Sequence, residues 1–466
     1  MLRTHTCGEL KADDAGKNAT LCGWLDAQRI QGKISFILIR DRYGITQVFV
    51  NPKLTSELGE LKRESVLKIH GKVNKRPDNQ VKKELSTGEV ELEAESIEVL
   101  SEAQPLPMEL DESVESTEET RLKYRYIDLR RPKMTKNLEL RHKAIQFIRE
   151  YLDKKDFLEI QTPILTKSTP EGARDFLVPS RMHKGKFYAL PQSPQQYKQI
   201  LMIAGMDRYF QVAPCFRDEA ARAHRAPGEF YQLDMEMSFV TQEDILKLTE
   251  DLFIKMVEKV FPDKKISKKP FPRLSHDKAM KEYGTDCPDL REDKKDKDEL
   301  AFCWVVDFPL FVKQTEDDYF YGAGKEWAPS HHMFTAPKEE DLHLLDTDPG
   351  KAQSYQHDLV LNGFEVGGGS IRIHDKELQE KIFQLIGFTD QQKKEFEHFL
   401  EAFKYGVPPH GGIAPGLDRL LMVIMGEESI REVIAFPKDK AAREPMMDAP
   451  STVTNEQLDE LNLRLK

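Results

Sequence analysis

The sequence predicts an α+β protein, with a small β-barrel at the N-terminus followed by a larger domain in which a mainly antiparallel sheet is flanked by helices. Three observations predict this fold class. Short β-rich segments follow one another up to residue 100, strand-like and helical segments mix beyond residue 133, and residues 101–121 are acidic, contain prolines and lack an apolar period. We therefore expect a barrel over 1–104, a linker over 105–132 and the larger domain over 133–466.

The barrel is predicted from β-rich segments bounded by Gly, Asn, Pro or charged residues. They cover residues 19–25, 33–44, 46–50, 65–73 and 88–100. A small barrel with this number of strands fits an OB-fold, which binds oligonucleotides on an exposed strand face where bases stack on aromatic rings. Phe36 is a candidate for such stacking, although a core phenylalanine explains it equally well.

The composition excludes several classes of protein. The 466 residues are 39% hydrophobic and 32% charged, and no stretch approaches the ~20 apolar residues of a membrane span. The first residues lack the apolar core of a secretory signal, and the five cysteines form no C-x-x-C pair. We expect a cytoplasmic protein with no zinc site and no membrane association.

A net charge of -11 disfavours sequence-blind binding to nucleic acid, but clusters such as Lys72, Lys75 and Arg76 are either a local positive face or ordinary solvated charges.

In the larger domain, residues 137–155 have apolar residues at helical spacing and precede a strand that reaches Pro163. Thr241 and Asp244 form a capping pair that opens another helix. Neither G-x-G-x-x-G after a strand nor G-x-x-x-x-G-K-[ST] occurs, so the common nucleotide-binding folds are not supported.

Asn362-Gly363 lies between two alternating apolar runs, which is a strong signal for a two-residue hairpin turn. Such a turn pairs Val360 with Glu365 and brings Asp358 onto the face of Glu365. Two converging carboxylates are costly unless a cation lies between them, and Mg²⁺ carrying nucleotide phosphates is the natural candidate. Two exposed carboxylates on a hydrated sheet are the alternative. The glycines at 367–369 favour the first interpretation, because they suggest that a backbone or ligand passes close by.

Two arginines have neighbours typical of anion binding. Arg217 lies in a strand before a charged loop, where its planar fork suits a phosphate or carboxylate, although an ion pair with Asp218 or Glu219 is a common alternative. Arg419 follows glycines at the start of an apolar helix, where backbone N–H groups and a cation can meet a phosphate. Close packing at those glycines is the other explanation.

Together these segments resemble the three ordered motifs of the class II aminoacyl-tRNA synthetases. The helix and strand ending at Pro163 resemble motif 1. Residues 216–219 with the following strand resemble motif 2, and residues 412–419 resemble motif 3. Within that class, residues 122–132, 169–180 and 187–199 are similar to bacterial-type aspartyl-tRNA synthetases. The likeness covers nearly the whole chain. It implies an OB-fold that reads an anticodon, a six-stranded antiparallel catalytic sheet, a homodimer, and ATP, Mg²⁺, L-aspartate and tRNA(Asp) as ligands.

The resemblance also implies roles for individual residues. Arg217 and Arg419 are the catalytic residues, acting by positioning and charge stabilisation. The residues implied to bind aspartate are Glu171, Ser193, Gln195, Lys198, Arg217, Asp234, His331, His332 and Arg372, with Lys198 and Arg372 at its side-chain carboxylate. Those implied to bind ATP are Arg217, Asp218, Glu219, Phe230, Glu365, Gly416, Leu417, Asp418 and Arg419. Asp358 and Glu365 are the implied metal ligands. The residues implied to bind the anticodon are Arg29, Phe36, Gln47 and Glu91.

The sequence departs from the bacterial pattern in several places. The large insertion domain of that family is reduced here to a charged loop near 291–299. In motif 2, Gly228 is an extra residue, and Ala226 and His224 replace a glutamine and an acid. In the barrel, Ala27 and Gln28 stand where arginines are common, which weakens phosphate contacts.

Three rival functions are considered from the sequence. The same core with asparaginyl or lysyl specificity is the nearest, and a non-catalytic RNA-binding protein would have lost at least one of Arg217, Arg419, Asp358 and Glu365, all of which are present. An ammonia-dependent asparagine-forming enzyme would not need the barrel. The sequence leaves open whether tRNA(Asn) is charged as well.

Overall fold

The fold comes from a computed structural model that describes residues 1–168, 173–219, 224, 226–314 and 326–465. The chain forms two compact units, Met1–Thr135 and Lys136–Lys466, and the division falls within helix α4 (Pro132–Asp153). Each unit has its own hydrophobic core.

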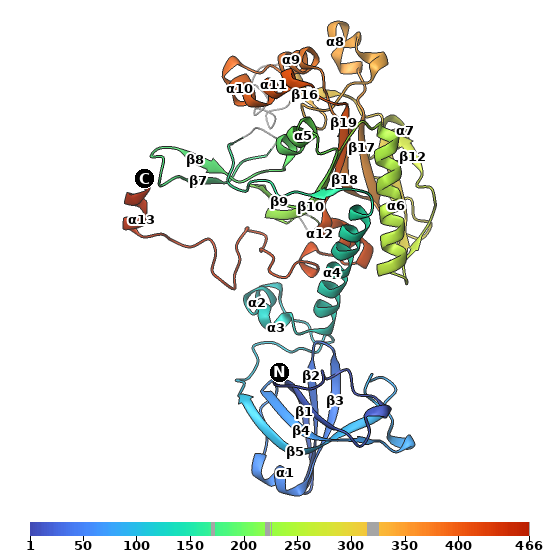
Figure 1. The fold of residues 1–466 in the computed structure, drawn as a ribbon, viewed down its shortest axis with the longest axis vertical. Coiled ribbons are helices and arrows are strands. Elements are labelled where there is room, and N and C mark those ends of the chain that lie inside the picture. Colours follow the sequence, from blue (N-terminus) through green and yellow to red (C-terminus); the bar gives the residue numbers. More distant parts are fainter. Residues whose placement is uncertain (169–172, 220–223, 225, 315–325, 466) are drawn as a thin grey trace. The chain divides into compact units, whose positions relative to one another are not determined.

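The first unit is built on a closed barrel of five strands in the order β1-β2-β3-β5-β4 (Figure 1). Its strands are β1 (Asn18–Gln31), β2 (Ile34–Asp41), β3 (Gly44–Val50), β4 (Val66–Lys75) and β5 (Val90–Ser101). Buried and less buried residues alternate along each strand, as a barrel filled with Leu, Ile and Val requires. All five predicted strands are confirmed, and β1 runs six residues beyond its predicted end at Leu25 because its last part pairs with β2.

The other elements of this unit are short. They are η1 (Ala12–Asp14), α1 (Pro52–Leu58), η2 (Asp78–Gln80), α2 (Glu118–Lys123) and α3 (Arg125–Asp128). Helix α1 lies between β3 and β4 and is capped by the Asn51 side chain, which accepts from the Leu54 N–H.

The second unit is organised around one sheet, in the order β12-β14-β17-β18-β19-β10-β9-β6 (Figure 1). The six central strands pair antiparallel, as predicted, and a short parallel strand is added at each edge. The strands are β6 (Leu158–Glu159), β9 (Arg208–Arg217), β10 (Gly228–Ser238), β12 (Arg273–Ser275), β14 (Phe302–Val306), β17 (Gln356–Leu361), β18 (Phe364–Ile371) and β19 (His410–Pro415). The predicted strand up to Pro163 is wrong in length: only Leu158 and Glu159 pair with β9, so the edge strand ends four residues earlier.

One face of the sheet is covered by α4, α6 (Gln242–Val260) and α12 (Leu417–Met425). The predicted start of α6 is confirmed by a capping box between Thr241 and Asp244. The other face carries α5 (Gln195–Ile203) and, beyond it, a second apolar cluster rich in phenylalanine. The site described below lies on this second face.

The remaining elements connect and flank the sheet. They are β7 (Leu177–Pro179), β8 (Phe187–Ala189), β11 (Lys265–Ile266), α7 (His276–Tyr283), β13 (Glu299–Leu300), β15 (Phe311–Lys313), β16 (Trp327–Pro329), η4 (Glu339–Asp341), α8 (Leu344–Thr347), η5 (Pro349–Lys351), α9 (Lys376–Leu385), α10 (Asp390–Glu395), α11 (Glu397–Ala402), η6 (Phe403–Tyr405), η7 (Ile430–Glu432) and α13 (Asn455–Glu460). No helix among the described residues is long and apolar enough to cross a membrane.

The charged loop near 291–299 is a short, well-bonded connection. The Arg291 guanidinium pairs with Asp289 at 2.8 Å and donates to the Asp296 carbonyl at 3.0 Å, while Lys264 pairs with Asp298 at 2.8 Å. The chain then enters β13, which pairs with β11. These ion pairs and the hydrogen bond hold the loop in place.

Candidate active site

Strand β10 places two acidic side chains on the site face by simple alternation. Leu233, Met235 and Met237 point into the core on the helix side, so Asp234 and Glu236 point the other way. Both carboxylates are fully removed from solvent. Gly412 on the neighbouring strand makes room for one of them, since a methyl group there would lie 2.3 Å from Glu236 Oε2.

The two acids are compensated by two buried cations. Lys198 Nζ from α5 lies 2.5 Å from Asp234 Oδ1 and 3.5 Å from Glu236 Oε2. Arg372 holds Glu236 in a bidentate pair, with Nε–Oε1 at 2.9 Å and Nη2–Oε2 at 3.1 Å. Its Nη1 donates to Ser370 Oγ at 2.6 Å and meets His332 Nε2 at 2.7 Å. The site floor is thus a network of two positive and two negative side chains.

The ionisation of this network follows from burial and pairing. Burial opposes the charge on Glu236, but Arg372 and Lys198 outweigh it, and the pKa of this carboxyl is lowered. Burial raises the pKa of Asp234 despite Lys198. Asp234 Oδ2 and Gln195 Nε2 have no hydrogen-bond partner among the described residues, so both are available to a ligand.

The paired histidines above this floor are held neutral. Burial lowers the pKa of His331 well below its usual range, and the positive charges of Arg372, Lys198 and Arg217 act in the same direction. Burial also lowers the pKa of His332 well below its usual range, and His331, Arg372 and Lys198 act in the same direction. His332 contacts Arg372, and the ring of His331 lies with its centroid 4.4 Å from that of His332.

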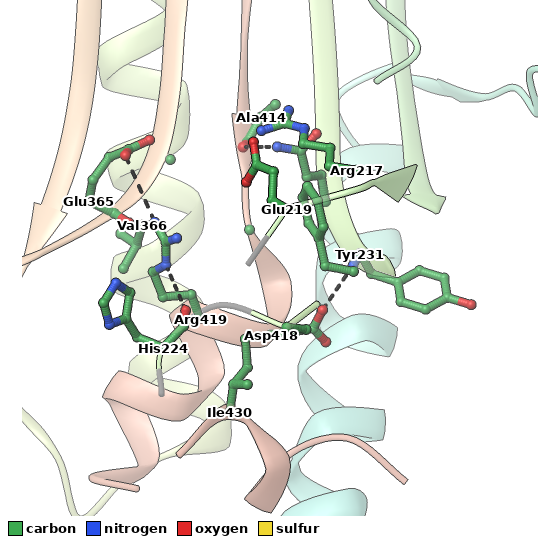
Figure 2. A pocket seen from close by; sticks show the side chains of 15 residues that line it. Arg217, Glu219, His224, Tyr231, Glu365, Val366, Ala414, Asp418, Arg419 and Ile430 are labelled. Atoms are coloured by element: carbon green, nitrogen blue, oxygen red, sulfur yellow. Dashed lines mark hydrogen bonds and ion pairs between the residues drawn. The ribbon is translucent and has the colours of Figure 1, made fainter. Parts of the chain in front are cut away.

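A second part of the site is the pocket that Figure 2 shows. Arg217 faces the pocket from β9, and Arg419 faces it from α12. The pocket is also lined by Glu219, Phe230, Glu365, Gly416 and Asp418. The Arg217 guanidinium lies over the Phe230 ring at 5.1 Å and its Nε donates to the Gln192 carbonyl at 3.3 Å. Gly228, which has φ of 80°, opens β10 directly opposite Arg217.

Arg419 is anchored by backbone groups around the pocket. Its Nη1 donates to the Glu365 carbonyl at 2.7 Å, and its Nε donates to the His224 carbonyl at 3.2 Å. Asp418 has a supporting position, because Arg141 of α4 binds its Oδ1 at 2.5 Å and the Tyr231 N–H binds its Oδ2 at 2.8 Å. Figure 2 shows Asp418 turned toward Tyr231, beside Arg419.

The predicted hairpin joins β17 and β18, with Leu361 opposite Phe364 and Val360 opposite Glu365. A bulge then shifts the register, so that Asp358 pairs with Gly368. A methyl group at Gly368 would lie 3.3 Å from Asp358 Oδ1 and 3.4 Å from Glu365 Oε1, which shows that the two carboxylates converge on one point. His331 Cε1 is 3.2 Å from the same point, so the carboxylates adjoin the histidines.

A bound cation would relieve the repulsion between these two carboxylates. Burial raises the pKa of Asp358 well above its usual value, and the neighbouring Glu365 raises it further. Among the described residues no three His, Cys, Asp or Glu side chains are arranged around a common metal position. Two carboxylates leave the remaining positions of an octahedral ion to phosphate oxygens and water, which is how Mg²⁺ is commonly held.

The structure also brings together the four candidate residues on the barrel. Arg29, Phe36 and Gln47 line one pocket on the outer strand face, and Gln47 Nε2 donates to Glu91 Oε2 at 3.0 Å. Phe36 is half-buried beside Phe49, with ring centroids 5.8 Å apart. Its ring is therefore outside the barrel core.

A few predicted residues lie elsewhere. Glu171 is outside the described residues. Asp218 is exposed and does not line the pocket, and the Leu417 side chain points into the core, so only its backbone is near the site. Glu236 was not among the residues predicted from sequence, although the alternation of Leu233, Asp234, Met235, Glu236 and Met237 carries the signal that places it beside Asp234.

Comparison with known proteins assigns the family. Residues 117–440 match the family described as tRNA synthetases class II (D, K and N), and residues 19–100 match the OB-fold nucleic acid binding domain. The chain is a class II tRNA synthetase. Members of this family use ATP as a substrate.

Among relatives, the chain is 41% identical to an aspartate–tRNA(Asp/Asn) ligase of Dehalococcoides mccartyi, in an alignment covering 100% of this chain and 99% of that protein. It is 42% identical to the ligase of the same name from Thermotoga neapolitana, covering 100% of both. The first alignment extends over 604 positions, whereas this synthetase has 466 residues. The relative therefore contains residues that have no counterpart here.

Solved structures support the fold. An asparaginyl-tRNA synthetase from Pyrococcus horikoshii superposes with a TM-score of 0.76 at 24% identity, covering 95% of this synthetase and 99% of that chain. An aspartyl-tRNA synthetase from Entamoeba histolytica gives 0.71 at 24% identity, covering 93% and 91%.

Proposed function

We propose that this synthetase is an aspartate–tRNA ligase that activates L-aspartate with ATP and transfers it to the 3′ end of tRNA(Asp), releasing AMP and pyrophosphate. The observation that supports this most directly is the pair of buried cations, Lys198 and Arg372, at the floor of the amino-acid site. The names of the full-length relatives point the same way.

The charges of the site fit a substrate with two carboxylates and one ammonium. Lys198 and Arg372 take the side-chain carboxylate, and Arg217 takes the α-carboxylate. The ammonium goes to Asp234, whose Oδ2 accepts no hydrogen bond from the described residues, together with Ser193 and Glu171, while Gln195 lies beside the side-chain carboxylate with its Nε2 as a donor. Asparagine is disfavoured because its amide presents donor hydrogens to groups that already donate, leaving buried polar atoms unpaired.

The chemistry is in-line attack by the aspartate α-carboxylate on the α-phosphate of ATP, with pyrophosphate as the leaving group, followed by transfer of the aspartyl group to the terminal ribose. No side chain needs to act as a nucleophile. Arg217 orients the carboxylate and the α-phosphate, and Arg419 binds the γ-phosphate at the opposite side of the pocket, so positioning and charge stabilisation supply most of the rate.

Asp358 and Glu365 hold Mg²⁺ in this proposal, together with phosphate oxygens. When bound, the ion neutralises phosphate charge. The fit rests on the convergence of two carboxylates, one with a raised pKa, at a position kept open by Gly368.

We also propose a homodimer and a second tRNA substrate. Leu158, Ile164 and Leu165, on and after the edge strand β6, are 47–53% exposed, which suits burial against a second copy. The relatives are named for both tRNA(Asp) and tRNA(Asn), so we expect both to be charged.

The test is pyrophosphate exchange with each free amino acid. Aspartate alone should support exchange, and exchange with asparagine or lysine instead would overturn the assignment. Charging purified tRNA(Asp) and tRNA(Asn) side by side then decides the tRNA specificity.

A further inference from the structure

Helix α4 carries an arginine to which neither the family match nor the proposed function gives a role. Arg141 Nη1 lies 2.5 Å from Asp418 Oδ1 and also donates to the Val433 carbonyl at 3.3 Å. Its guanidinium carbon is 6.0 Å from the centre of the Tyr231 ring. The side chain of Arg141 is 16% exposed and that of Asp418 is 2% exposed. Arg141 therefore belongs to a largely buried, charge-assisted pair and not to the solvated surface of the helix.

The partner of Arg141 connects two backbone segments that face the pocket of Figure 2. Asp418 directly precedes Arg419 at the start of α12. Its Oδ2 accepts from the N–H of Tyr231 at 2.8 Å, and Tyr231 directly follows Phe230 in β10. Arg419 and Phe230 both line the pocket. The position of this one carboxylate therefore affects a residue on each of the two segments.

Asp418 also lines the pocket itself, and its charge has the wrong sign for binding a triphosphate. Figure 2 shows its side chain turned toward Tyr231. Arg141 compensates this charge and occupies the second carboxylate oxygen. Without the guanidinium, the carboxylate would keep one hydrogen bond and lose its paired cation. A buried charge that has lost its partner is costly, and here it would also repel bound phosphate.

We propose that Arg141 is a positioning residue for ATP. By pairing with Asp418, it neutralises a carboxylate at the wall of the phosphate-binding pocket and fixes the start of α12 next to β10. It acts on ATP through Asp418 and not by direct contact. The proposal rests on the proposed function for the placement of ATP between Arg217 and Arg419.

The test compares Arg141→Met and Arg141→Lys with Arg149→Met in the full-length protein. Arg149 lies about two turns further along α4 and pairs with Glu159 at 2.8 Å, outside the pocket, so Arg149→Met removes an ion pair from the same helix. The KM for ATP and the KM for aspartate are measured separately by pyrophosphate exchange, at a temperature well below the melting temperature of each variant.

We expect Arg141→Met to raise the KM for ATP by about 10- to 100-fold, the loss typical of a hydrogen bond between charged groups. The KM for aspartate should change by less than about threefold, since Arg141 makes no hydrogen bond or ion pair with Lys198 or Arg372 in the part of the chain that the structure describes. Arg141→Lys should have the smaller effect because lysine keeps the charge. Arg149→Met should match the wild type.

A second substitution separates charge from packing. Asp418→Asn in the Arg141→Met background removes the uncompensated charge, while the amide oxygen can still accept from the Tyr231 N–H. We expect the double variant Arg141→Met/Asp418→Asn to recover most of the lost affinity for ATP. If Arg141 served packing alone, the double variant would bind ATP no better than Arg141→Met.

Two results would overturn the proposal. One is an equal rise of both KM values in Arg141→Met, which indicates general damage to the active site. The other is a double variant whose KM for ATP stays at the level of Arg141→Met. Should Arg141→Met fail to fold, Arg141→Gln, which keeps a donor without the charge, takes its place, and an unchanged KM for ATP in that variant would also overturn the proposal.

A failure of the proposed function gives a different pattern. In that case the wild-type protein would show no aspartate-dependent exchange, whatever happens at position 141. Calorimetric titration with ATP and Mg²⁺ in the absence of an amino acid then tests Arg141 independently of catalysis. The expected result is weaker binding in Arg141→Met and recovery in the double variant, and equal affinities in the wild type and Arg141→Met would refute the role of Arg141.

Discussion

At the scale of single residues, the amino-acid site is a balance of charges that a substrate must rearrange. Glu236 occupies two donors of Arg372, Nε and one on Nη2, and Lys198 is shared between Asp234 and Glu236. Leaving any one of these charges without its partner in the interior is expensive. A residue that serves both stability and specificity therefore needs a test that separates the two.

Arg372→Ala is expected to reduce aspartate-dependent pyrophosphate exchange by at least about 100- to 1000-fold while ATP still binds. It should also destabilise the protein by about 3–5 kcal/mol, because Glu236 loses its bidentate partner in the interior. The double variant Arg372→Ala/Glu236→Gln recovers much of that stability but not aspartate activation. Exchange kinetics, ATP titration and thermal melting on both variants check this, and activity in the double variant would contradict the proposed role.

Asp358 gives a prediction for pH. Its pKa is raised in the folded protein, so the folded state keeps this proton to higher pH than the unfolded chain does. The ligand-free protein should therefore lose stability as pH rises above the ordinary value of 3.8, and Asp358→Asn should melt at a higher temperature than wild type at neutral pH. MgATP should reverse the order by stabilising wild type more. Melting curves at several pH values, with and without MgATP, measure both effects.

At the scale of elements, the hairpin of β17 and β18 shows how much of a strand pairing a local sequence pattern can predict. Asn362-Gly363 is enough to predict the turn and the first two residue pairs, and alternation predicts that Asp358 and Glu365 share a face. The bulge between Leu359 and Val360 could not be predicted, because the turn signal fixes only the residue pairs next to the turn. Asp358 and Glu365, the proposed metal ligands, nevertheless stay together, since the bulge moves Asp358 opposite Gly368.

The three consecutive glycines of β18 have two different functions. A methyl group at Gly369 would lie 2.2 Å from the Gly412 carbonyl oxygen and 2.7 Å from His357 Nε2, whereas at Gly368 its nearest neighbours are side-chain atoms at 3.2–3.4 Å. The clash at Gly369 involves the backbone of the adjacent strand, whereas the close contacts at Gly368 involve His331 and the two proposed metal ligands. Sequence reasoning predicted close approach but could not tell these partners apart.

The matched variants Gly369→Ala and Gly368→Ala test this distinction. Gly369→Ala should destabilise the sheet by about 1–3 kcal/mol or more, because the backbone of β19 has to move. Gly368→Ala should change stability by less than about 1 kcal/mol, yet raise the Mg²⁺ concentration needed for exchange by about tenfold. Urea unfolding and Mg²⁺ titrations measure the two effects, and equal destabilisation by both variants would refute the separation.

At the scale of the whole molecule, two properties bear on how this acidic protein would bind RNA. They are its net charge and its division into two units. With a net charge of -11, general attraction to phosphate is weak, and recognition has to come from local groups such as those on the barrel. The two units have separate hydrophobic cores, so the proposed base reading and the proposed amino-acid activation would each depend on a different core. The connection at 291–299 is held by its own ion pairs and leads directly into β13, and the residues proposed for the active site lie outside this loop.

This division predicts that damage to the barrel surface affects tRNA only. Phe36→Ala removes a half-buried ring from the outer strand face, and loss of one stacked base is worth about 1–3 kcal/mol, so the KM for tRNA should rise about 5- to 100-fold. Aspartate-dependent exchange without tRNA should stay within twofold of wild type, because the second unit has its own core and contains every group proposed to bind aspartate and ATP. Phe49→Leu, which alters the neighbouring ring but leaves Phe36, is the matched control. A parallel loss of exchange in Phe36→Ala would mean that the barrel contributes to activation itself.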